Sequence, residues 1–522
     1  MRNTGHRTFE SATRACSALL VLLVLSHPGS AFGATDEVTD LGISDAVEDR
    51  LLSDPAVPLN RIGVSVENGV VELDGTVTNV TAKQRAVELA TVIRGVRSII
   101  DRIRVVPVWD VSDEELEADV REALFRDPAT EEWEVEINVA DASVDLTGVV
   151  DSWSEKRLAE RIAGSVRGVR EVDNGIAVEI VENRGDSELE MEIEAMLRWD
   201  AYLSRSVIRT RVEDGAAVLT GSVCSLGQRV LAANNAWVAG VRSVDVSGLE
   251  IIDCAAGTIE TRRLSTPPPS DEEIAAAVHA AFTIDPRIGT TEIRVGVDQG
   301  EVTLRGRVSN LRERSAAAED ARNTTGVTGV VNRLQLRSEL FLPEILLPDP
   351  ELALLVSGAL DRDPYVERFD IGVATLGGTV YLTGTVDTEF DRARAEKLAA
   401  TIVGVMEIKN HLRVLDPLAI RSDGRPLGEF PHNGQPWYRP LWEASPRTDA
   451  SIRRSIESRL WWSAEIDSDN VAVRVDDGVA TLVGTVGSWR ERDAATHAAY
   501  SGGATSVRNR LDVDFPVMGS KP

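Results

Sequence analysis

One seven-residue pattern, apolar-x-Leu-x-Gly-x-Val, recurs six times along the chain and constrains the fold more than any other feature. Strict alternation of apolar and other residues over this length is typical of a strand with one buried face. Six copies at intervals of 73 to 100 residues predict a chain of repeated structural units. The glycines at the centre of the pattern are Gly75, Gly148, Gly221, Gly306, Gly384 and Gly484.

A turn signal and a second alternating run precede each of these strands. Asn68-Gly69, Asp214-Gly215 and Asp477-Gly478 are examples of the turn signal, and Asp141-Ala142 in the second copy is the weakest match. Asn-Gly and Asp-Gly dipeptides supply the positive φ angles that a two-residue hairpin requires. Each copy is therefore predicted to contain an antiparallel hairpin.

Helical segments are predicted on both sides of the hairpin, with a third alternating run at the end of each copy. In most copies the first helix ends before Asp-Pro, because proline disfavours helical geometry in the residue before it. The third and sixth copies have Asp200-Ala201 and Ser463-Ala464 instead, and less defined helix ends are expected there. The unit reads α-β-β-α-β. A right-handed crossover should place the third strand parallel to the second. The predicted class is α+β, with six three-stranded mixed sheets that each carry two helices on one face.

The strand glycines are interpreted as determinants of the fold rather than ligand-binding residues. A glycine inside a strand commonly allows a close approach by a neighbouring helix or permits local backbone strain.

The N-terminal segment has the order of a secretory signal peptide: early arginines, a short apolar run and small residues near Gly33. The apolar run is too short for a membrane anchor. We expect cleavage near Gly33 and an exported, periplasmic protein. The expected boundaries are 1–33 for the signal peptide; 36–107, 110–182, 186–254, 269–337, 348–416 and 448–515 for the units; and 255–268, 338–347 and 417–447 for linkers. Their uneven spacing suggests that the first three units pack regularly and the others are separate beads.

The net charge of −28 excludes a generally basic nucleic-acid-binding protein. The predicted second helices of the first two units are richer in cations than their first helices. Such helices could present a basic face to anionic lipid headgroups. The alternative is that these are ordinary solvated surface charges. The candidate lipid contacts are Lys83, Arg85, Arg94, Lys156, Arg157 and Arg161.

Two cysteines follow the signal peptide, Cys224 and Cys254, both in the third unit. They come just after strands predicted to be parallel, so they should lie at the same edge of the sheet. An oxidising compartment favours a disulfide between them. The alternative is a pair of free thiols whose Cα atoms lie beyond bridging reach.

The sequence gives no support for catalysis. Its histidines occupy unrelated positions in the repeat and lack metal-ligand spacing. No nucleophile stands in a recognisable elbow, and no phosphate-binding glycine loop is found in the sequence. We therefore expect neither enzymatic activity nor a cofactor or metal.

The α-β-β-α-β unit, with its Asn-Gly hairpin and Val-x-Leu-x-Gly-x-Val strand, resembles the BON domain, named for bacterial osmotic-stress and nodulation proteins. The resemblance covers six units and implies an exported envelope protein rather than an enzyme. It implies non-enzymatic association with phospholipid surfaces or other envelope components, through several weak sites. The alternatives are a periplasmic protein–protein scaffold or stress-protective protein without membrane contact, and a carrier for an enzyme. We expect no nucleic-acid partner and no transmembrane segment in the mature chain.

Overall fold

The computed structural model describes most of the six repeats. The described residues are 38–57, 62–108, 111–127, 129–130, 135–179, 184–204, 206–252, 269–289, 292–336, 347–367, 369–414 and 448–513. The predicted signal peptide, the 255–268 and 417–447 linkers, most of the 338–347 linker and Cys254 lie outside these ranges.

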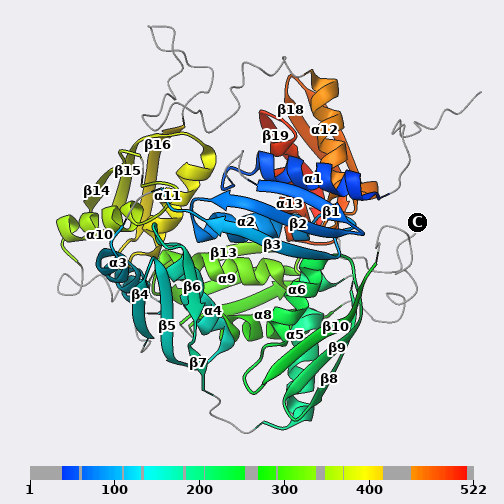
Figure 1. Cartoon of the computed structure of the whole chain (residues 1–522), viewed down its shortest axis with the longest axis horizontal. Coiled ribbons are helices and arrows are strands. Elements are labelled where there is room, and N and C mark those ends of the chain that lie inside the picture. The colour runs from blue at the N-terminus through cyan, green and yellow to red at the C-terminus, as the bar shows by residue number, and fades with distance from the viewer. Residues whose placement is uncertain are drawn as a thin grey trace, which may run out of the picture. The chain divides into compact units, whose positions relative to one another are not determined.

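Each repeat folds in the predicted order, helix, hairpin, helix, strand (Figure 1). The first unit contains α1 (Asp40–Ser53), β1 (Ile62–Glu67), β2 (Val70–Val77), α2 (Val80–Thr91) and β3 (Ser98–Val105). The second contains α3 (Asp113–Arg126), β4 (Val135–Ala140), β5 (Ser143–Val150), α4 (Trp153–Gly164), β6 (Glu171–Asn174) and β7 (Ala177–Val178). The third contains α5 (Asp186–Trp199), the 3-10 helix η1 (Ala201–Leu203), β8 (Val207–Glu213), β9 (Ala216–Val223), α6 (Leu226–Ala236) and β10 (Ser243–Ile251).

The last three units repeat the same sequence of elements. The fourth contains α8 (Asp271–Ile284), β11 (Arg294–Asp298), β12 (Glu301–Val308), α9 (Leu311–Asn323) and β13 (Gly329–Leu336). The fifth contains α10 (Asp349–Asp361), β14 (Gly372–Leu376), β15 (Thr379–Val386), α11 (Glu389–Thr401) and β16 (Glu407–Val414). The sixth contains α12 (Asp449–Trp462), the 3-10 helix η5 (Ser468–Asn470), β17 (Val471–Asp476), β18 (Val479–Val486), α13 (Trp489–Ser501) and β19 (Ser506–Val513).

The glycine-containing strand is the centre of every sheet. It pairs antiparallel with the strand before it and parallel with the strand after the second helix, as β2 does with β1 and β3. In the second unit the third strand is interrupted, so β6 and β7 both pair with β5. The predicted class, α+β with six mixed-sheet units, is confirmed.

The first residue of every first helix is an aspartate that also holds the hairpin turn. In the fourth unit the Asp271 carboxylate accepts backbone N–H bonds from Gln299 and Gly300, at 2.9 and 3.0 Å. The corresponding residues are Asp40, Asp113, Asp186, Asp349 and Asp449. These aspartates therefore fix the hairpin turn, and their negative charge also interacts favourably with the dipole of the helix that they begin.

The helices of the third and sixth units end as sharply as those followed by proline, so the expectation of less defined ends was wrong. Like α1, α5 and α12 are each 14 residues long. After α5, Asp200 accepts a bond from the N–H of Tyr202 at 2.9 Å, and η1 begins. At both helix ends the capping residue turns to an extended backbone, with φ and ψ of −74° and 114° at Asp200 and −77° and 118° at Ser463, which stops each helix without proline.

The strand glycines have positive φ angles, from 129° to 143°. A Cβ built on Gly306 would lie 2.1 Å from the backbone oxygen of Glu292, and one on Gly484 only 1.9 Å from that of Asn470. The close neighbour at these two positions is thus the chain entering the preceding strand, and not a helix. Glycine allows the two strands to pair at this point.

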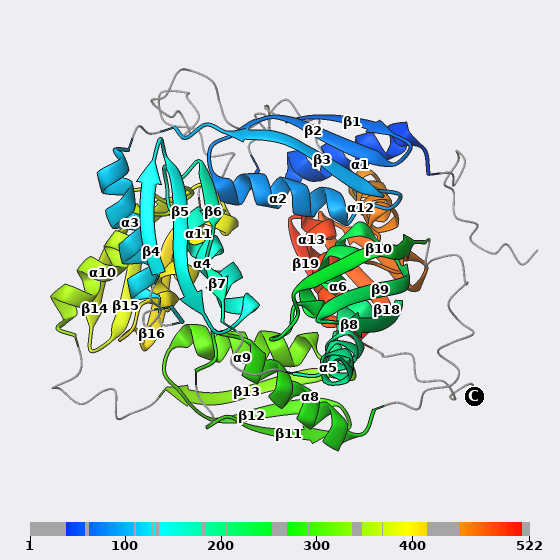
Figure 2. The ribbon, with the colours of Figure 1, turned by 60° about the horizontal axis from the view of Figure 1, so that its bottom comes forward.

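The units also pack against one another, so the expectation that the later ones are separate beads was wrong. The end of α2 pairs with the end of α12 through Ile93 and Ser463, and the end of α9 pairs with that of α5 through Thr324 and Asp200. The N–H of Arg167, after α4, donates to the oxygen of Arg362, after α10, at 2.8 Å. The second helices also meet, α2 with α4 and α6, and α9 with α11 and α13 (Figure 2).

Candidate binding surfaces

The two candidate lysines tie the second helix to its own sheet. Lys83 Nζ donates to the backbone oxygen of Ile103 at 2.8 Å and lies 3.3 Å from the Asp101 carboxylate. Lys156 Nζ donates to the oxygen of Ile176 at 2.7 Å and lies over the Trp153 ring. Both lysines are half-buried and hold equivalent positions in the first two units.

Arg85 neutralises a buried carboxylate. Its Nε and Nη2 donate to one oxygen of Asp54, at 3.0 and 2.9 Å, and the Asp54 side chain is only 3% exposed. Burial alone would lower the pKa of Arg85, but the Asp54 carboxylate more than offsets this and the pKa is raised. This arginine stabilises the end of α1.

The other three candidates do not complete a basic face. Arg94 lies over the Trp461 ring of the sixth unit at 4.9 Å. Arg157 is half-buried, and burial, with neighbouring Arg161, lowers its pKa. Arg161 alone among the six candidates is exposed. The second helices pack against other units, so the structure does not bring these cations together on an open surface.

The sheet of the fourth unit carries the clearest exposed basic surface. Arg294 of β11 stands opposite Arg305 of β12, which in turn stands beside Arg333 of β13. All three are exposed, whereas the alternate residues Val302 and Leu304 are fully buried. We call these three residues the arginine row. Like charges directly opposite one another destabilise a sheet, and within the described residues none of the three has an ion-pair partner.

Two further sheets expose basic side chains on the same face. In the fifth unit Lys409 lies over the Tyr381 ring at 5.3 Å, and His411 stacks on the same ring. In the sixth, Arg474 and Arg508 flank Thr481. These basic sheet surfaces were not predicted from the sequence. Basic residues that alternate along a strand, as in Arg305-x-Arg307, were a signal that could have indicated them.

The sheet of the second unit is acidic on the equivalent face. Asp145 stands beside Asp173, and Glu136 and Glu171 are exposed on the flanking strands. The six units therefore share a fold but differ in surface charge, so they cannot be equivalent binding sites for an anion.

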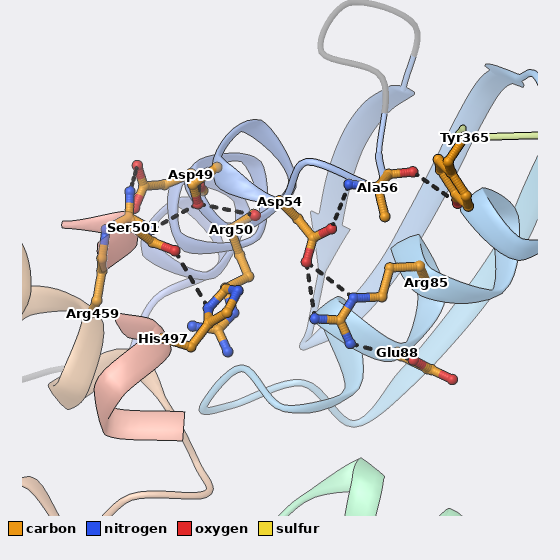
Figure 3. A network of polar contacts seen from close by, with 11 residues as sticks. Asp49, Arg50, Asp54, Ala56, Arg85, Glu88, Tyr365, Arg459, His497 and Ser501 are labelled. Atoms are coloured by element: carbon orange, nitrogen blue, oxygen red, sulfur yellow. Dashed lines mark hydrogen bonds and ion pairs between the residues drawn. The ribbon is translucent and has the colours of Figure 1, made fainter. Parts of the chain in front are cut away.

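A polar network lies where the first and sixth units meet (Figure 3), and a cavity lies beside it. Arg459 of α12 donates to the Asp49 carboxylate of α1 at 2.7 Å and to the Ser53 hydroxyl at 2.8 Å. The adjacent cavity has a volume of about 210 Å³ and is lined in part by Asp49, Arg50 and Arg459.

Cys224 is disulfide-bonded. Cys254, the partner expected from the sequence, lies outside the described residues, so that pairing remains a prediction. Among the residues that the structure describes, no cluster of three His, Cys, Asp or Glu side chains is arranged to hold a metal ion. In the same part of the chain no helix has the length and hydropathy needed to cross a bilayer.

Comparison with known families identifies the repeat. A model of the BON domain matches residues 39–107, 112–180, 185–253, 270–338, 348–416 and 448–514. The chain belongs to the BON-domain family. Its six BON units include all the described helices and strands.

Individual relatives cover smaller parts of the chain. Osmotically-inducible protein Y of Escherichia coli (strain K12) is 33% identical over 144 residues, which are 27% of this chain and 72% of that protein. Two structures of the type III secretion protein CdsD of Chlamydia trachomatis were also found, one of them its C-terminal domain. They have 14% and 16% identity, cover 44% and 43% of this chain and 100% and 98% of theirs, and have TM-scores of 0.12.

Proposed function

We propose that this chain is an exported envelope protein that associates, without catalysis, with anionic phospholipid surfaces through the exposed sheet faces of some of its BON units. The arginine row of the fourth unit is the observation that carries this proposal. Three neighbouring guanidiniums lie on one exposed face, and guanidiniums bind phosphate oxygens in a fork geometry.

The energetics favour a weak, multivalent interaction. Each cation near an anionic surface contributes about 1 kcal/mol. Repulsion from the acidic remainder of the chain is screened beyond about 8 Å at physiological salt. The basic sheets of the fifth and sixth units would add to the avidity if they meet the surface together with the fourth.

Two further observations support export and a role in stress. The disulfide at Cys224 is of a kind that persists in oxidising compartments. The similarity to an osmotically-inducible protein supports a role in osmotic stress.

Vesicle co-sedimentation tests the proposal. The protein is mixed with anionic or neutral phospholipid vesicles at low and moderate salt. We expect salt-sensitive binding to the anionic vesicles only. Replacing Arg294, Arg305 and Arg333 by Gln should weaken that binding by about a hundredfold at low salt, since about 3 kcal/mol of attraction is removed.

A matched control removes the same charge elsewhere. Replacing Arg121, Arg453 and Arg454 by Gln changes exposed arginines of the first helices α3 and α12. This variant should keep most of the binding. An equal loss in both variants would contradict the assignment to the sheet. Failure of the protein to bind any vesicle would overturn the lipid proposal and favour a protein–protein scaffold.

A further inference from the structure

Among the residues that the structure describes, Arg50 is a buried cation with no partner, at the junction of the first and sixth BON units. It lies on α1, is 8% exposed, and extends toward His497 of α13 (Figure 3). Its Nε is buried without a hydrogen bond. Within the described residues its guanidinium forms neither a hydrogen bond nor an ion pair, and burial lowers its pKa.

Three carboxylates near Arg50 are already engaged by other cations. Asp49 pairs with Arg459 at 2.7 Å, and Asp54 pairs with Arg85 at 2.9 Å. Glu465, the largest attractive charge on Arg50, lies 3.1 Å from the Nε of Arg490. The buried charge of Arg50 is therefore not paired by any of these three carboxylates.

The cavity lining also includes the exposed carboxylate of Asp45, but the other buried groups near Arg50 add no negative charge. Burial and the neighbouring guanidiniums, Arg50 first among them, lower the pKa of His497 to about 4, so this side chain is neutral at pH 7. Ser463, which is 2% exposed, also has a buried hydroxyl that finds no hydrogen-bond partner in the described part of the chain. Both Arg50 and Ser463 line the cavity of about 210 Å³.

A buried charge without a partner is costly, and an unsatisfied hydroxyl adds to that cost. A small oxyanion would satisfy both groups, because its oxygens accept from a guanidinium and a hydroxyl. The cavity is large enough for such an anion but also contains Asp45 and Asp49, which disfavour a large or highly charged one.

We propose that the cavity between the first and sixth BON units binds one small oxyanion, a phosphate or carboxylate group, with Arg50 as its main ligand and Ser463 as a second. Because the anion contacts α1 and the residue that follows α12, its binding would hold these two units together. The site is separate from the arginine row.

Calorimetry and thermal unfolding of the full chain test this site, with inorganic phosphate and acetate as probes and sodium chloride at equal ionic strength as the reference. We expect one phosphate per chain and a higher melting temperature in phosphate. Arg50→Met should weaken phosphate binding at least tenfold. Without anion this variant should melt at or above the wild-type temperature, because the unpaired buried charge is gone.

Two variants make the result specific. Arg157→Met removes another half-buried arginine, on α4, and should leave phosphate binding unchanged. Ser463→Ala removes only the second ligand and should weaken binding severalfold, which provides a test even if Arg50→Met fails to fold. Wild-type protein that responds equally to phosphate and chloride would overturn the proposal, as would a phosphate response unchanged in both Arg50→Met and Ser463→Ala.

A further probe in the same experiment distinguishes two sources of the anion, a lipid headgroup and a free anion. Dimethyl phosphate has the diester charge of a lipid headgroup, whereas inorganic phosphate and acetate represent free anions. Saturable, Arg50-dependent binding of dimethyl phosphate would support the site and assign it to headgroups. Binding of the free anions alone would support the site and assign it to small solutes.

Discussion

At the scale of single residues, His497, which lies where the first and sixth units meet, should make the stability of the folded chain depend on pH. Burial and the guanidiniums of Arg50, Arg85 and Arg459 lower its pKa to about 4, while Asp54 opposes them. Its ordinary pKa is 6.5. Between these values the unfolded chain binds a proton that the folded chain does not, so stability falls as the pH drops from about 6.5 toward 4.

We predict that His497→Gln removes part of this pH dependence. The shift corresponds to about 3 kcal/mol at most, since one pKa unit is about 1.4 kcal/mol. Urea unfolding at pH 7 and pH 4.5 should therefore show a smaller difference in the variant than in the wild type. His411→Gln, which removes an exposed histidine of β16, serves as the control. If both variants behave alike, the buried histidine does not cause the effect.

The sequence did not predict these residue roles, for a physical reason. Arg50 and Arg85 are ordinary charged residues on amphipathic helices, and their burial depends on which unit packs against which. The aspartates that begin the first helices are different. Asp271 precedes its turn amides by 28 and 29 residues, as do most of its counterparts, so this regular spacing was a signal available in the sequence.

At the scale of elements, the pairing of the first two strands depends on the central glycine. We predict that Gly306→Ala destabilises the fourth unit by about 3 kcal/mol or more. The added Cβ would lie 2.1 Å from the oxygen of Glu292, at a φ of 132° that side-chain-bearing residues rarely adopt. Hydrogen exchange of the β11 and β12 amides measures the loss.

Gly296→Ala in the same sheet is the matched control for this substitution. The nearest neighbour of its added Cβ is the oxygen of Thr303 at 4.0 Å, so little change is expected. Equal destabilisation by the two substitutions would mean that loss of a flexible glycine matters and the close strand contact does not.

Most of the element order could be predicted because the information is local. Alternation defined the strands, and positive φ angles at Asn68-Gly69 and Asp477-Gly478 confirm the hairpin turns. Even Ala142 takes this conformation in the weakest copy, with a φ of 60°. Whether a basic side chain lies on an open surface or in a contact between units was less predictable. The second helices look like exposed amphipathic helices in isolation, and only the contacts between units cover them.

At the scale of the whole chain, the described units associate in pairs, and two of the three pairs join units that are distant in sequence. Helix ends pair between the first and sixth, second and fifth, and third and fourth units. Repeat spacing could not predict this pairing. Linker length sets how far apart two units can lie, but it does not determine which units pack together.

A disulfide cross-link tests the contact between the first and sixth units. The hydrogen bonds from Arg94 to Trp462 and from Ala464 to Val92 flank Ile93 and Ser463, which are therefore a non-hydrogen-bonded antiparallel pair. The Cα atoms of such pairs are about 4.5 Å apart, within the range for a disulfide. Ile93→Cys with Ser463→Cys should close a loop that changes mobility on a non-reducing gel and is identified by peptide mapping. Ile93→Cys with Thr324→Cys combines residues from two different contacts and should remain largely reduced. Similar cross-linking in both pairs would show that the units move past one another freely, and the buried environment of Arg50 would then be lost for much of the time.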